Sequence, residues 1–180
     1  MDKQLSIDQL TSKLCWLFAV VGMFRGDEID CIDLSHEQFS INPQVAILPI
    51  ALPKEKRRMG RICKFATIHA HANPSLCPVA TLKEYLDRLP MGDDLVPHRK
   101  DPAVLVRPLI RDKCDLRKVV GPDTTNRHIG TITDLLERPR SAPRPRARAI
   151  GASAASKNGT PVNEIVVQAS WSSSVMVDSF

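Results

Sequence analysis

Apolar positions near the start of the chain recur at helical intervals. Between residues 7 and 24, one helical face carries Leu10, Leu14, Leu17, Phe18 and Val21. Ser6 and Gln9 stand at the spacing of a capping box, in which each side chain bonds the backbone N–H of the other residue. The segment predicts a buried amphipathic helix. Gly26 interrupts it before a second, short helical pattern over residues 27–34.

A different pattern follows between residues 45 and 70. Two short β-prone runs, "VAILPIAL" and "RICKFATIHA", flank the polar segment "PKEKRRMG". This arrangement predicts a β-hairpin with a basic tip. Pro49 and Pro53 favour edge positions, because proline has no N–H to donate to a neighbouring strand.

Helical spacing returns later in the chain. Pro78 fits the first turn of a helix that continues to Leu89. Residues 122–136 and 147–158 also carry helical periodicity. Gly159 is expected just past the second of these helices, where a left-handed residue commonly ends a helix.

The remaining segments complete the predicted architecture. Asn163 is the expected cap of a last helix that reaches Ala169. Residues 103–110 are either a strand or a loose connection, and the basic, proline-rich residues 138–146 form a loop. Together the elements predict one α+β domain over residues 1–180, mainly helical, with a small antiparallel sheet or hairpin.

Composition narrows the class of protein. Hydrophobic residues make up 43% of the 180 residues and charged residues 25%, the usual proportions of a globular protein. No apolar run approaches the roughly 20 residues that span a bilayer, so no membrane partner is expected. The opening residues do not match a secretion signal or a transit peptide, which favours a nuclear or cytoplasmic location. The five cysteines form no C-x-x-C pair, so they indicate neither a metal site nor a disulfide framework.

Positive charge is concentrated in one segment. The formal net charge is +5, and five arginines lie between Arg138 and Arg148. No acid stands between Glu137 and Glu164. A local field of this kind suits a polyanion such as double-stranded DNA, although a solvated surface would also explain it.

Four stretches follow one another in a recognisable order. They are "GMFRGDEI", the hairpin segment "PKEKRR", "NPSLCPVATLKEYL" with "GPDTTNRHI", and "RAIGASAASKNGTPVNEIVVQASWSSS". In this order they resemble the catalytic domain of tyrosine recombinases, the phage-integrase-like family, in the form carried by eukaryotic transposable elements. The resemblance runs from about Leu10 to Phe180. It implies the fold of that family, double-stranded DNA as the partner, a role in DNA integration and recombination, and a nuclear rather than a cytoplasmic location.

The resemblance also implies residue roles. In the family a tyrosine attacks a DNA phosphodiester, and two arginines stabilise the charge that grows on the phosphate. These arginines correspond to Arg25 and Arg148, with Glu28 holding Arg25 through a buried pair. The general acid corresponds to Lys54. Trp171 takes the position of a hydrogen-bond donor to the scissile phosphate.

Further DNA contacts are implied by the basic residues around these positions. Lys56 is the alternative general acid and otherwise a DNA contact. The other expected DNA contacts are Arg57, Arg58, Arg144 and Arg146. No metal ion or other cofactor is implied, because cationic side chains supply the positive charge at the phosphate.

Two positions depart from the family pattern. The histidine expected three residues before the second arginine is Pro145, which has no ionisable group. The nucleophilic tyrosine is expected at or just after Phe180, where the sequence has none, so cleavage is expected to be impaired. The one tyrosine, Tyr85, lies on the apolar face of its predicted helix and is assigned to packing.

The ends of the pattern affect the expected DNA binding. The recombinase pattern begins close to Met1, so no amino-terminal clamp domain is expected, and one-sided DNA binding should be weak and salt-sensitive. The segment that joins such recombinases into assemblies would follow Phe180. Any homo-oligomer on DNA is therefore expected to be weak.

A second hypothesis comes from a different class of protein. The chain would be a non-catalytic basic helical module that binds a partner through the proline- and arginine-rich residues 138–146. Deleting these residues would then abolish binding, whereas Arg25→Ala would change nothing. His69 and His71 alternate along a predicted strand, but with no third ligand nearby they indicate no metal site.

Overall fold

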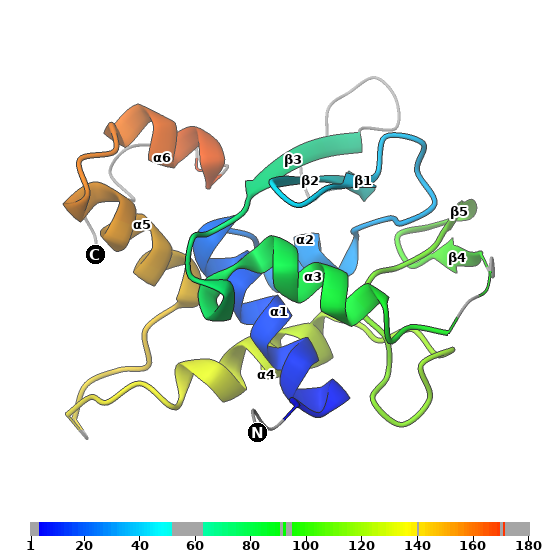
Figure 1. The fold of residues 1–180 in the computed structure, drawn as a ribbon, viewed down its shortest axis with the longest axis horizontal. Helices are drawn as coiled ribbons and strands as arrows, with labels where there is room; N and C mark the ends of the chain where they lie inside the picture. The colour runs from blue at the N-terminus through cyan, green and yellow to red at the C-terminus, as the bar shows by residue number, and fades with distance from the viewer. Residues whose placement is uncertain are drawn as a thin grey trace.

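The computed structural model describes residues 4–51, 63–90, 92, 95–139, 141–169 and 171 (Figure 1). Within these ranges the chain forms six α-helices and two antiparallel sheets, which confirms the predicted α+β class. None of these helices has the length and apolar character that a bilayer crossing requires. In chain order the elements are α1 (Ile7–Val21), α2 (Gly26–Asp30), β1 (Ser40–Ile41), β2 (Val45–Ala51), β3 (Cys63–His69), a short 3-10 helix (Pro74–Leu76), α3 (Pro78–Leu86), β4 (Val96–His98), β5 (Asp101–Val106), α4 (Pro122–Thr133), α5 (Ala147–Lys157) and α6 (Val162–Gln168).

Helix α1 is the central element of the molecule (Figure 1). Ser6 Oγ accepts a hydrogen bond from the Gln9 amide at 3.2 Å, and Gln9 Oε1 accepts one from the Ser6 amide at 2.9 Å. The predicted capping box is therefore confirmed. Helices α2, α3, α4 and α5 all contact α1, which explains why it is buried on nearly every side. The helix ends at Val21, before the predicted Phe24.

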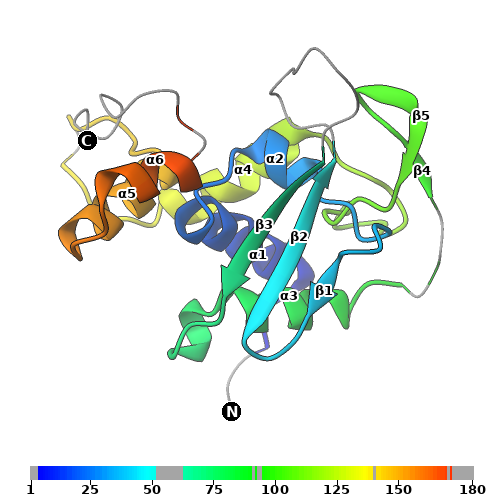
Figure 2. The ribbon, with the colours of Figure 1, turned by 90° about the horizontal axis from the view of Figure 1, so that it is seen from above.

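The three-stranded sheet β1-β2-β3 is antiparallel and covers α1 and α3 (Figure 2). The predicted hairpin strands are confirmed, and β2 pairs with β3 from Val45 opposite His69 to Ala51 opposite Cys63. Pro49 does not lie on an edge strand, so that prediction is wrong. Strand β1 pairs only with Ala46 and Ile47, and the missing N–H of Pro49 therefore costs no bond to β1. Pro53 lies outside the described residues.

The second helical pattern is shorter than predicted. Helix α2 has five residues, because Ile32 and Asp33 leave the helix and form β-bridges with Ile50 and Pro108. The segment 103–110 begins as a strand, since β5 pairs with β4 in a separate antiparallel hairpin. This hairpin lies at the side of the molecule, beyond the end of the main sheet (Figure 2).

Helices α5 and α6 form a lobe at the opposite side (Figure 1). Gly159 follows α5 with φ +82°, which confirms the predicted left-handed residue after this helix. Helix α6 begins after Pro161 rather than Asn163, and no side chain caps it. The lobe has its own small core of Met23, Ala152, Ile165 and Ala169, against which Trp171 packs. Gly151 permits the close approach of α5 to α1, since a Cβ there would overlap the carbonyl of Val20.

Candidate anion-binding site

The junction between α1 and α2 places Arg25. Met23 adopts φ +53°, a left-handed conformation that turns the chain out of α1. The buried Phe24 then packs edge-to-face on Phe18, with ring centroids 6.0 Å apart. Arg25 follows as the N-terminal cap residue of α2 and is partly exposed. The turn therefore directs the chain so that Arg25 stands at the start of α2.

Glu28 fixes the backbone of Arg25 rather than its guanidinium. Glu28 is 4% exposed, and its Oε2 accepts a hydrogen bond from the Arg25 amide at 2.8 Å. Its Oε1 lies 3.2 Å from Lys64 Nζ on β3. The predicted Arg25–Glu28 ion pair is therefore wrong, because Lys64 supplies the cationic partner of Glu28. In the described part of the chain, the Arg25 guanidinium makes no hydrogen bond or ion pair.

Arg148 joins the α1–α2 junction to the end of α6. Its Nε donates a hydrogen bond to the Met23 carbonyl at 2.6 Å, and its Nη2 donates to the Ala169 carbonyl. Its guanidinium carbon lies 5.6 Å from the centre of the Trp171 ring, a distance at which a cation is attracted to the ring face. Arg148 therefore lies beside Trp171 and next to the turn that places Arg25.

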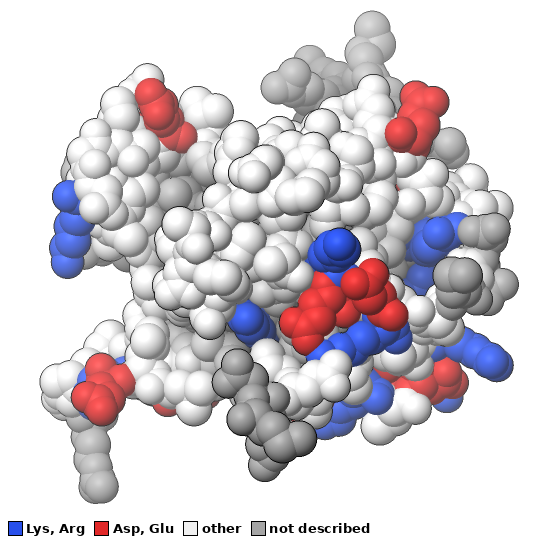
Figure 3. All heavy atoms as spheres, in the orientation of Figure 1, with Lys and Arg blue, Asp and Glu red and all other residues white. Residues whose placement is uncertain are grey.

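A pocket of about 390 Å³ brings four arginines together. Its walls come from the start of α2, one face of α4 and residues 144–148. Its charged lining residues are Arg25, Arg144, Arg146 and Arg148, and no acid lines it. We call this pocket, with these four arginines, the arginine pocket. By contrast, the face with α3 in front carries acidic and basic side chains next to one another (Figure 3).

The charge inside the arginine pocket is only partly balanced. Burial, then the nearby charges of Arg25 and Arg146, lower the pKa of Arg148 to about 10, and Glu28 opposes them. Arg144 pairs with Asp134 at 2.6 Å, outside the pocket lining. No hydrogen bond or ion pair is formed by the guanidinium of Arg146 with any described residue. The pocket therefore carries an excess of positive charge and of hydrogen-bond donors, which an oxyanion would balance.

The sequence-predicted site residues fall into three groups. Arg25, Arg144, Arg146 and Arg148 meet in the arginine pocket, and Trp171 lies beside Arg148. Glu28 does not line the pocket and instead bonds the backbone amide of Arg25. The third group lies outside the described residues and comprises Lys54, Lys56, Arg57, Arg58 and Phe180.

Two residues among those described cannot carry out the chemistry of strand cleavage. Pro145 lines the arginine pocket and cannot accept or donate a proton. Tyr85 is fully buried, and its hydroxyl accepts a hydrogen bond from the Arg111 amide at 3.1 Å. Burial raises the pKa of Tyr85 to about 12, so the phenol is neither accessible nor readily ionised. No cluster of three metal-ligating side chains occurs in the ranges that the structure describes.

Two residues near the site were missed by sequence reasoning. Lys64 lies on β3 at the same alternate positions as the buried Ala66 and Ile68, and pairs with Glu28. Asn126 on α4 lines the arginine pocket and lies so close to Gly26 that a Cβ there would overlap it. Nothing in the local sequence pattern marks Asn126.

Comparison of the sequence with known protein families and with curated proteins gives no match.

Proposed function

We propose that this chain is a tyrosine-recombinase-type domain of a mobile element that binds duplex DNA through the arginine pocket. The observation that carries the proposal is the pocket of about 390 Å³ whose lining includes four arginines and no acid. Arg25 and Arg148 come from opposite ends of the sequence, as the resemblance to the family implies. The finer fold assignment over residues 1–180 and a nuclear location are parts of the same proposal.

The geometry supports a phosphate ligand for physical reasons. Arg25 and Arg146 have guanidinium donors that no described residue engages, and a guanidinium fork matches two oxygens of a phosphate. Arg148 also lines the pocket and adds its charge, while the carbonyls of Met23 and Ala169 hold its guanidinium in place. Binding an anion would also restore the lowered pKa of Arg148, because a negative charge favours the protonated form.

The proposal covers binding and phosphate positioning rather than strand cleavage by these residues. Tyr85 is buried and hydrogen-bonded, so its hydroxyl cannot reach a phosphate in the arginine pocket. Pro145 supplies no proton relay. Trp171 has an indole N–H that donates only, which suits contact with a phosphate oxygen but not proton transfer.

The alternative, a free proline- and arginine-rich ligand segment, has weaker support. Asp134 pairs with Arg138 at 3.6 Å and with Arg144 at 2.6 Å, and these contacts tie the loop back to the end of α4. Arg144 and Arg146 at the end of the same loop line the arginine pocket. The loop is therefore held against α4, and its end forms part of the pocket lining.

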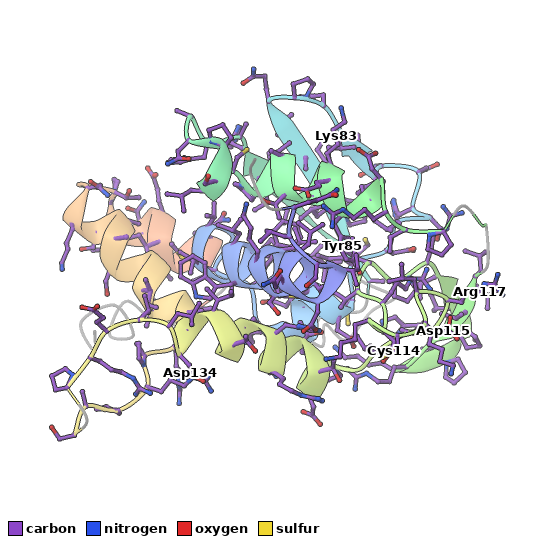
Figure 4. The ribbon with its side chains drawn as sticks, turned by 60° about the horizontal axis from the view of Figure 1, so that its bottom comes forward. Lys83, Tyr85, Cys114, Asp115, Arg117 and Asp134 are labelled. Atoms are coloured by element: carbon purple, nitrogen blue, oxygen red, sulfur yellow. The ribbon has the colours of Figure 1, made fainter. Side chains whose placement is uncertain are left out.

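Fluorescence anisotropy with a labelled duplex tests the proposed function. We expect salt-sensitive binding, and a loss of about 10- to 100-fold for Arg25→Gln, because charged hydrogen bonds to phosphate contribute roughly 1.5–3 kcal/mol. Arg117→Gln is the matched control. Arg117 is exposed and lies at the far end of the molecule from Asp134 (Figure 4). An affinity that does not change with salt concentration, or equal affinities of Arg25→Gln and Arg117→Gln, would refute the proposal.

A further inference from the structure

Helix α2 is too short to be stable without support from other elements. Its five residues are fewer than the number needed for a helix to persist alone in water. Arg25 is the N-terminal cap residue of α2, so any shift of α2 also moves the Cα and Cβ atoms of Arg25. The contacts that hold α2 therefore determine where this guanidinium stands in the arginine pocket.

The turn between β4 and β5 grips the acidic side of α2. Arg99 Nη2 lies 2.7 Å from Asp27 Oδ1, and Lys100 Nζ lies 2.7 Å from Asp27 Oδ2. Arg99 Nε also donates to Asp30 Oδ2 at 3.4 Å, and the Asp30 side chain is 8% exposed. Arg99 and Lys100 come from a hairpin about 70 residues further along the chain. We call these two residues, together with Asp27 and Asp30 of α2, the hairpin clamp.

The two carboxyl groups of the clamp differ in their pKa: burial outweighs the charge of Arg99 and raises the pKa of Asp30, whereas the pKa of Asp27 is lowered. Burial alone would raise the pKa of Asp27, but hydrogen bonds and charge from Lys100 and Arg99 outweigh it and hold the pKa below its usual range. Asp27 is therefore ionised at neutral pH and keeps both cations. On another side of α2, Glu28 meets Lys64 and Gly26 meets Asn126. The helix is thus held from several directions at once.

We propose that Arg99 and Lys100 are positioning residues, which place Arg25 for phosphate binding by fixing α2 through Asp27 and Asp30. The inference rests on the proposed function, because it concerns the affinity of the arginine pocket. None of the four clamp residues lines that pocket. Their effect on a bound phosphate would act through α2 and Arg25.

The direction in which one substitution changes the DNA affinity distinguishes this positioning role from long-range electrostatic attraction. Asp27→Asn makes the protein more positive by one charge, and long-range attraction alone would then strengthen binding to DNA. The clamp predicts the opposite, a loss of about 3- to 10-fold, because coupled neighbours contribute measurable interaction energy. Asp27→Glu keeps the carboxylate and should bind within about twofold of the wild type. Asp115→Asn is the matched control, because it removes one acid from a surface pair with Lys118 at the far end of the molecule (Figure 4).

The experiment is a double-mutant cycle with Arg25, measured by anisotropy with the same labelled duplex. Circular dichroism sets a temperature at which every variant is folded. If Asp27→Asn does not fold, Asp30→Asn replaces it, since that substitution breaks only the 3.4 Å contact. We expect the loss caused by the clamp variant to disappear in the Arg25→Gln background.

Each outcome decides the matter. A clamp variant that binds as tightly as Asp115→Asn, or that loses the same factor with and without Arg25, overturns the positioning role. If Arg25→Gln weakens binding while the clamp variants do not, only the clamp inference fails. If Arg25→Gln binds like the wild type, the proposed function fails and the clamp inference fails with it.

Discussion

Arg148→Met is expected to destabilise the fold as well as weaken binding. Methionine keeps most of the apolar stem of arginine but has no donor, so the carbonyls of Met23 and Ala169 lose their side-chain partner. These two bonds link the α1–α2 junction to the end of α6, and the contact with Trp171 adds to the same link. The substitution therefore removes this link, while the close packing of α5 on α1 at Gly151 remains.

The size of the effect follows from these contacts. A hydrogen bond from a charged group contributes roughly 1.5–3 kcal/mol, so two of them give at least about 3 kcal/mol. Removing a partly buried cation next to Arg25 and Arg146 returns part of this stability. We expect a net loss of about 2–3 kcal/mol, or a decrease in Tm of roughly 5–10 °C for a chain of this size.

Urea unfolding monitored by circular dichroism measures this loss. Arg146→Met is the matched control, because the Arg146 guanidinium engages no described residue and its removal should change the unfolding free energy by less than about 0.5 kcal/mol. Both variants should bind DNA more weakly. If Arg148→Met is as stable as the wild type, or if the two variants lose equal stability, the structural role derived for Arg148 is wrong.

Further predictions concern salt, pH and the buried tyrosine. In Arg25→Gln, the slope of log affinity against log salt concentration should become less negative by about 0.9, because one phosphate contact is lost; an unchanged slope would count against that contact. Because burial lowers the pKa of Arg148 to about 10, its charge and the DNA affinity should fall as the pH rises through that value, and titrations of Arg148→Gln should lack this component. Burial also lowers the pKa of His128, whose Nδ1 lies 2.9 Å from Ser12 Oγ, so the neutral form stabilises the fold. That stability is present above the ordinary pKa of 6.5 and is lost as the pH falls through the lowered value. The unfolding free energy of His128→Asn should not show this decrease at low pH. Tyr85→Phe should cost about 1–2 kcal/mol of unfolding free energy, with DNA affinity unchanged, and neither protein should form a covalent adduct with a nicked duplex through Tyr85.

Most of the fold could be predicted from local pattern. The capping box of Ser6 and Gln9, the proline at the start of α3 and the left-handed Gly159 are local signals, and the structure confirms each of them. Two errors had non-local causes. The end of α2 is set by β-bridges with distant residues, and Pro49 is accommodated because β1 is only two residues long.

The candidate site divides in the same way. A resemblance in residue order was enough to single out Arg25 and Arg148, and the structure brings them to one pocket. The partner of Glu28 could not be predicted, because Lys64 lies 36 residues away and reaches it only after β3 packs. The grip of Arg99 and Lys100 on α2 was equally invisible in the sequence, since a charged turn is an ordinary surface feature until its partners are known.

The bond between Arg148 and Met23 spans 125 positions of the chain. Contacts between residues so far apart in the sequence form slowly, because the entropy of closing the intervening chain is lost before the contact stabilises the fold. A growing chain on the ribosome would therefore carry the arginines of the pocket as scattered charges until Arg148 has been synthesised and packed against the α1–α2 junction. A fragment that ends before Arg148 should therefore lack the assembled arginine pocket, even though it contains Arg25.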